Sequence, residues 1–186
     1  MRALQKVGIG LVIVVLQARF GPWDALADPV GWGFVLAGLL ALRTRVRGAD
    51  TLLASCGVAL VVAVGVYPPV VHDALSPAAA WALSLPQAVF CLLVCHTLAP
   101  YAGHLRRRLL LLRWVFAVVA VLPVLVLGGG VTRLADPAAG LAGLAALYLV
   151  YLLFRLAGRV PLDDRAPLDD HPEPAGETGS ETGGEA

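Results

Sequence analysis

Six apolar runs, separated by short polar loops, constrain this chain more than any other feature of its sequence. A helix needs about 20 apolar residues to cross the hydrocarbon core of a bilayer. With 59% hydrophobic residues and a mean hydropathy of +0.80, the chain lacks the polar side chains that cover a soluble domain. The sequence therefore predicts an all-α membrane protein with six transmembrane helices arranged as three successive hairpins. The expected spans are about 4–20, 29–43, 50–67, 77–100, 109–128 and 137–157.

Positive charges are concentrated in alternate loops. The N-terminus holds Arg2 and Lys6, and the loops RTRVR at 43–47 and HLRRR at 104–108 hold three arginines each. Because cytoplasmic loops carry an excess of Lys and Arg, this pattern predicts a multi-pass protein with its N-terminus and C-terminus in the cytoplasm. A composition rich in arginine and free of asparagine favours a bacterial cytoplasmic membrane.

A cleaved signal peptide is the alternative interpretation of the N-terminus. Arg2 and Lys6 would be its charged region, and Ala25-Leu26-Ala27 would be its cleavage signal. That signal lies far from the apolar core of residues 7–16, with Arg19 and a proline between them. The sequence therefore favours a retained first span.

The C-terminal segment differs from the rest of the chain in charge. Residues 1–162 carry thirteen Lys and Arg against five acids, whereas the remainder carries eight acids against Arg165. Repeated PLDD, several prolines and a Gly/Glu/Thr-rich end predict disorder. We expect a transmembrane domain over 1–160 and a disordered acidic cytoplasmic tail over 161–186. The tail is expected either to stay solvated or to dock on the basic loops or on a membrane or cytoplasmic protein.

Each span that runs from outside to inside begins with a polar residue followed by proline. The polar side chain can accept a hydrogen bond from a free N–H of the first helical turn. Proline is tolerated at the first helical position because its missing N–H would be unpaired there. The pairs are Asp28-Pro29, Ser76-Pro77 and Asp136-Pro137. Trp23 and Trp32, on either side of the first pair, are expected to anchor the hairpin at the membrane interface.

The first two spans are short in their apolar portions. Each apolar run between Val7 and Leu42 has about fourteen residues, or about 21 Å of helix, against a hydrocarbon core of about 30 Å. Either the bilayer thins locally, or the turn that carries Asp24 and Asp28 sinks below the outer interface. A sunken turn would be a candidate polar site. Its candidate residues are Asp24, Asp28, Gln87 and Asp136.

The same hairpin carries a resemblance. Its short apolar helix and polar turn, followed by DPVGWGFVLAGLLAL, resemble the first hairpin of small, uncharacterised bacterial integral membrane proteins. The resemblance covers residues 10–43, and its motif is an Asp-containing turn that leads into a Gly-aromatic helix start. It implies a membrane fold and no activity.

The fourth and fifth spans contain side chains with several interpretations. Gln87, Cys91 and Cys95 share one helical face, which would suit either a soft-metal or redox site or a small packing face. The CxxxC spacing is not that of a thiol-disulfide motif, so packing is favoured. Pro86 and Pro123 are expected to kink their helices, either to shape packing or to frame an outward-facing cavity.

Other side chains are expected to pack or to anchor the bundle. Stripes of small residues, such as Gly33, Ala37 and Ala41, predict close helix contacts and are compatible with a dimer. Arg113, beside Trp114, is expected to extend toward the cytoplasmic interface.

Motifs for nucleotide, metal or acyl chemistry (a Walker A loop, HExxH, GxSxG) are absent from the sequence. We therefore expect a polytopic integral membrane protein of non-enzymatic type, without a cofactor, that acts as an assembly or accessory protein. The alternatives are a small-solute transporter or channel with an outward-facing cavity, and a membrane enzyme that uses the outer aspartates. Expected partners are the lipid bilayer, a protein bound through the acidic tail, and further copies of the chain, with no nucleic acid.

Overall fold

The computed structural model describes residues 2–15, 19–20, 23–24, 28–68, 70–71, 74–128 and 135–159, so the acidic tail at 161–186 lies outside the described residues. Six α-helices correspond to the six expected spans, except that Arg19–Phe20, expected within the first span at 4–20, form a strand. The helices are α1 (Ala3–Val15), α2 (Asp28–Leu42), α3 (Ala49–Val66), α5 (Pro77–Leu98), α6 (Arg106–Gly128) and α7 (Ala135–Arg159). Two 3-10 turns, Ala99–Tyr101 and Gly103–Leu105, join α5 to α6. Two-residue strands, β1 (Arg19–Phe20) and β2 (Trp23–Asp24), pair in an antiparallel hairpin between α1 and α2.

Helix length divides the bundle into two classes. Within the described residues, three helical segments are long and apolar enough to cross a membrane, namely Ala49–Val66, Ala78–Tyr101 and Gly140–Gly158. Six full-length spans are therefore not confirmed. Helices α1 and α2 have 13 and 15 residues, or about 20 and 22 Å at 1.5 Å per residue. They are short because their apolar runs are short, as the sequence indicates.

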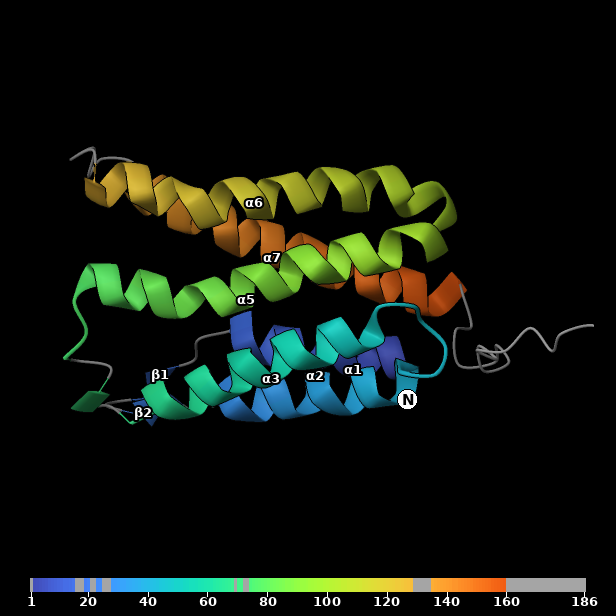
Figure 1. The fold of residues 1–186 in the computed structure, drawn as a ribbon, viewed down its shortest axis with the longest axis horizontal. Coiled ribbons are helices and arrows are strands. Elements are labelled where there is room, and N and C mark those ends of the chain that lie inside the picture. Colours follow the sequence, from blue (N-terminus) through green and yellow to red (C-terminus); the bar gives the residue numbers. More distant parts are fainter. Residues whose placement is uncertain are drawn as a thin grey trace, which may run out of the picture.

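The basic residues of the loops gather at one end of the bundle, which we call the basic end. Figure 1 shows that this end (right) holds the N-terminus, the turn between α2 and α3, the turn between α5 and α6, and the end of α7. Its arginines are Arg2, Arg43, Arg45, Arg47, Arg106, Arg107 and Arg108, with Arg155 and Arg159 in the last two turns of α7. Among the described residues, the one ion pair joins Arg43 Nε to Asp50 Oδ1 at 2.8 Å, and both side chains are exposed. The described part of the basic end therefore carries more positive than negative side chains.

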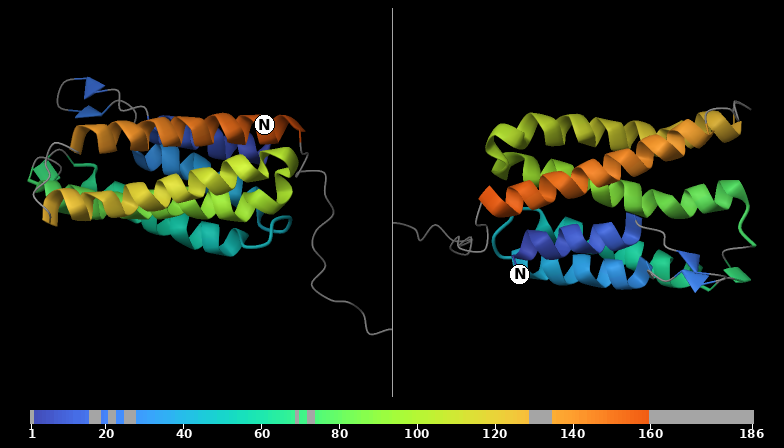
Figure 2. Two further views of the ribbon diagram at one scale, coloured as in Figure 1. Left: turned by 90° about the horizontal axis from the view of Figure 1, so that it is seen from above. Right: turned by 180° about the vertical axis from the view of Figure 1, so that it is seen from behind.

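Six helices surround one apolar core. Helix α1 packs against α2 and α7, α3 packs against α2 and α5, and α6 packs against α5 and α7. Figure 2 shows α7 crossing the bundle obliquely beside α1 and α6. In the described part of the chain, every buried side chain is apolar or a cysteine, and no polar or charged side chain is buried. The fold is therefore held together by apolar packing and close helix contact.

Burial is confined to the half of the bundle near the basic end. On α3 the buried side chains lie between Ala49 and Ala59, and on α6 they lie between Leu109 and Phe116. On α5 burial begins at Phe90, and on α7 at Ala145, although these helices start thirteen and ten residues earlier at the opposite end. The described side chains in the other halves of these four helices are half-buried or exposed. We call that part of the bundle the outer half.

Glycines bring α1 and α2 into backbone contact. A Cβ atom on Gly10 would overlap the carbonyl oxygen of Gly31, and a Cβ on Gly31 would lie 2.7 Å from Val14 Cγ2 and 2.8 Å from the Gly10 oxygen. Gly38 is equally close to Val7 and to the Ala3 carbonyl. The stripe that the sequence prediction chose is not the face of α2 that contacts α1, because Gly33, Ala37 and Ala41 are exposed and Gly33 has open space beside it. Its use in a dimer stays a prediction.

Gly31→Ala is expected to lower the free energy of unfolding by about 1–3 kcal/mol, because the added methyl overpacks a backbone contact that cannot yield easily. Gly33→Ala is the matched control on the same helix. It should leave stability unchanged or raise it by up to about 1 kcal/mol through helix propensity. Thermal unfolding of the purified protein in detergent measures both changes, and equal effects of the two variants would contradict the assigned interface.

Candidate functional site

The structure places the four predicted site residues on separate elements. Asp28 is the first residue of α2, Asp136 is the second residue of α7, and Gln87 lies near the middle of α5. Asp24 ends β2, and its Cα pairs in register with that of Arg19. The Gln87 side chain is half-buried, whereas the side chains of the three aspartates lie outside the described residues. The levels of Asp28, Asp136 and Gln87 along the bundle still follow from the helices that carry them, whereas Asp24 lies on β2 and is not placed in this way.

An aromatic junction fixes α2 against α5. Trp32 and Phe90 meet edge to face with ring centroids 5.1 Å apart, and both side chains are almost completely buried. The Cys56 thiol of α3 lies 3.9 Å from the Trp32 carbonyl oxygen. Trp32 is therefore a core residue and not an interfacial anchor, so that prediction is wrong. It was wrong because α2 begins below the end of the bundle, which places Trp32 one turn further into the core.

The Trp32–Phe90 contact allows the level of Asp28 along the bundle axis to be derived. Phe90 is thirteen residues from Pro77, so the junction lies about 20 Å from the outer end of α5. Asp28 is four residues from Trp32 toward the same end, which brings it within about 14 Å of the level of Pro77. The level of Asp28 is therefore also the level of Pro86 and Gln87 on α5. Two of the four candidates, Asp28 and Gln87, therefore lie at the same depth near the middle of the bundle.

Helical register places positions 28 and 87 on the buried faces of their helices. Position 87 continues the buried series Cys91, Val94 and Leu98 on α5 toward the outer half. Position 28 continues the corresponding series on α2, whose buried members are Trp32, Val35, Leu39 and Leu42. Both candidates thus stand at the point where apolar packing ends and the outer half begins.

Asp136 lies at a different depth. The Phe154 ring covers Gly8, where a Cβ would be 3.2 Å from its Cε2 atom, and this contact sets the level of α7 against α1. The contacts between α1 and α2 then place Asp28 level with Leu149. Asp136 is thirteen residues further out, or about 20 Å. The structure therefore separates Asp136 from Asp28 and Gln87, and it leaves Asp136 at the outer end of the bundle.

The polar residue and proline mark the helix starts as expected. The Ser76 hydroxyl accepts a hydrogen bond from the Ala79 backbone N–H at 3.2 Å, and Pro77 is the first residue of α5. Helices α2 and α7 also begin at or one residue before their Asp-Pro pairs. The cap on α5 is confirmed, and the capping roles of Asp28 and Asp136 stay predictions because their side chains lie outside the described residues.

The cysteine face of α5 is packed. Cys91 and Cys95 are buried and carry free thiols, and Cys56 is buried on α3. His96 is exposed, and its Nδ1 lies 3.1 Å from Nη1 of Arg113 on α6. No group of three potential metal ligands comes together among the described residues. The arrangement therefore supports the packing interpretation of this face.

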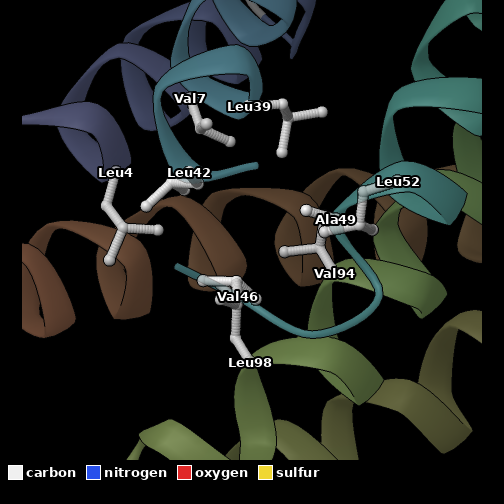
Figure 3. A pocket seen from close by; sticks show the side chains of 9 residues that line it. All are labelled: Leu4, Val7, Leu39, Leu42, Val46, Ala49, Leu52, Val94 and Leu98. Atoms are coloured by element: carbon white, nitrogen blue, oxygen red, sulfur yellow. The ribbon is translucent and has the colours of Figure 1, made fainter. Parts of the chain in front are cut away.

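A small cavity lies near the basic end. Its volume is about 10 Å³, and its nine lining side chains are all apolar. Figure 3 shows them converging from α1, α2, α3, α5 and the turn that carries Val46. A space of this size holds at most one water, and a water needs polar partners, which this lining does not supply. The cavity is a packing defect of the inner core and offers no solute site.

No protein-family model, no curated protein and no solved structure matches this chain. The resemblance of residues 10–43 to small bacterial integral membrane proteins therefore stays a prediction.

The depth of Asp28 can be measured directly. A fluorophore attached to Asp28→Cys in a variant lacking the three native cysteines is expected to be quenched best by lipids brominated deep in the acyl chains. The same label on Asp136→Cys should be quenched best by lipids brominated near the headgroup, because the two levels differ by about 20 Å along α7. Equal quenching profiles at the two sites would contradict the sunken start of α2.

Proposed function

We propose that this protein is a multi-pass integral membrane protein that acts without catalysis, by assembling with a second membrane protein through its outer half. In this proposal the six helices all lie in the bilayer. The basic end faces the cytoplasm, as the excess of arginine in its loops favours, and both termini lie on that side.

The loss of burial in the outer half carries the proposal. The positions that continue the buried faces of the helices are occupied by small or apolar residues that are only half-buried, including Ala63 on α3, Leu83 on α5 and Ala142 on α7. In lipid, helices associate by close van der Waals packing, and small residues allow that approach. A partner's transmembrane helix would complete the packing that the chain's own helices leave unfinished.

Trp81 supports the same proposal. Its indole Nε1 is enclosed, yet it has no hydrogen-bond partner. A buried indole N–H normally finds an acceptor, and leaving such a donor unpaired costs about 1–3 kcal/mol. Trp81 lies in the outer half of α5. Because the atom is enclosed by the chain's own side chains, a partner's acceptor reaches it only when the outer half rearranges on assembly.

Transport of a small solute is the second candidate, and the shared depth of Asp28 and Gln87 favours it. An ionisable residue at mid-membrane is costly and commonly marks a solute or ion pathway. This candidate requires water in the outer half, whereas the neighbouring positions there are largely apolar. The assembly proposal therefore has the broader support, and the two candidates differ in whether protein or water fills the outer half.

A photo-crosslinking amino acid at Ala142 is expected to give one discrete protein adduct in native membranes. The matched control is the same amino acid at Leu111, an exposed position on the inner half of α6, which should yield mainly lipid adducts. Adducts should persist when the chain ends at Val160, because the proposed contact lies in the bundle. Loss of the adduct on removing the tail would instead assign the partner to the tail.

Thiol labelling separates assembly from transport. Ala142→Cys should resist a membrane-impermeant maleimide in native membranes and react after purification away from the partner. The buried native cysteines should contribute little background. Rapid labelling in intact membranes would favour a water-filled outer half and would contradict the assembly proposal.

A further inference from the structure

A cationic group on the outside of the bundle has no acidic partner among the residues that the structure describes. Arg113 lies seven residues from the start of α6, or about 10 Å from the basic end. It is half-buried, and no acidic side chain among the described residues pairs with it, since Asp50 pairs with Arg43.

The polar contact of Arg113 is His96 on the neighbouring helix. Arg113 Nη1 lies 3.1 Å from His96 Nδ1. Because a guanidinium can only donate, His96 Nδ1 is the acceptor. The other imidazole nitrogen, Nε2, then carries the proton. The pair thus presents several N–H donors and a full positive charge on the exposed side of the α5–α6 contact, and no acidic side chain of the described part of the chain accepts from them.

Trp114 completes the site. The Arg113 guanidinium lies 5.3 Å from the centroid of the Trp114 ring, and Trp114 is 63% exposed. Exposed tryptophans are characteristic of membrane interfaces, where the indole ring sits at the level of the lipid headgroups. Arg106, two turns away on the same face of α6, adds positive charge at the rim.

We propose that Arg113, His96 and Trp114 form a binding site for the phosphodiester of an anionic phospholipid in the leaflet at the basic end. Phosphate oxygens match the planar donor fork of arginine, and the histidine N–H supplies a further donor. The anionic class follows from the excess of arginine around the site, which attracts a lipid of net negative charge more strongly than a zwitterionic one. The site is independent of the outer half and of the proposed assembly.

The test uses the purified full-length protein in detergent, titrated with phosphatidylglycerol and followed by native mass spectrometry. Wild type should retain one phosphatidylglycerol more tightly than phosphatidylcholine. Arg113→Gln should weaken retention about tenfold, because a charge-assisted hydrogen bond contributes roughly 1.4 kcal/mol or more. His96→Ala should weaken it less. Arg108→Gln, which removes an exposed arginine of the same helix outside the site, is the matched control and should retain the lipid.

Three outcomes would overturn the proposal. Equal retention by Arg113→Gln and wild type would exclude the guanidinium, and an equal loss in Arg108→Gln would indicate diffuse attraction in place of a site. Displacement of the lipid by inorganic phosphate at equimolar concentration would assign the site to a soluble anion. Thermal unfolding of each variant verifies that a lost adduct does not reflect a lost fold.

Discussion

The backbone contact between α1 and α2 is the constraint on which the rest of the structure depends. Gly10 and Gly31 let two short helices touch along their length, because neither carries a Cβ that would separate them. That contact, with the Trp32–Phe90 junction, fixes the start of α2 deep in the bundle. The depth of Asp28 and its level with Gln87 follow from this geometry.

The two halves of the bundle differ in how their helices are packed. Near the basic end all six helices contribute side chains to one apolar core, and the arginines stand around it in the connecting turns. In the outer half the two short helices have ended, and four longer helices continue without a buried core between them. The bundle is therefore complete at one end only, and the proposed protein contact and the proposed lipid site lie in different halves.

The sequence predicts the number of helices and most of their bounds, because arginine loops and polar-proline starts mark the ends of the apolar runs. It predicts the serine cap on α5 for the same reason. It extends the first helix too far, since Arg19 and Phe20 form a strand. It does not predict which face of α2 is buried. In a helix that is apolar on all sides, Gly31 and Gly33 are equally suited to a close helix contact, and the amphipathic pattern that would distinguish the buried face is missing. The burial of Trp32 and the Arg113–His96 contact depend on how deep each helix sits against its neighbour, and a sequence pattern carries no such depth.

The uneven burial also bears on how the chain opens. Local opening requires little free energy where few apolar contacts are broken, and it approaches the global value in a packed core. Amide hydrogens of α5 and α7 near Phe90 and Leu153 should therefore exchange only in the rare opening of the whole inner core. Those in the first turns of the same helices exchange through frequent local fraying. A single helix thus belongs to two cooperative units, and protection changes along its axis and not from one helix to the next.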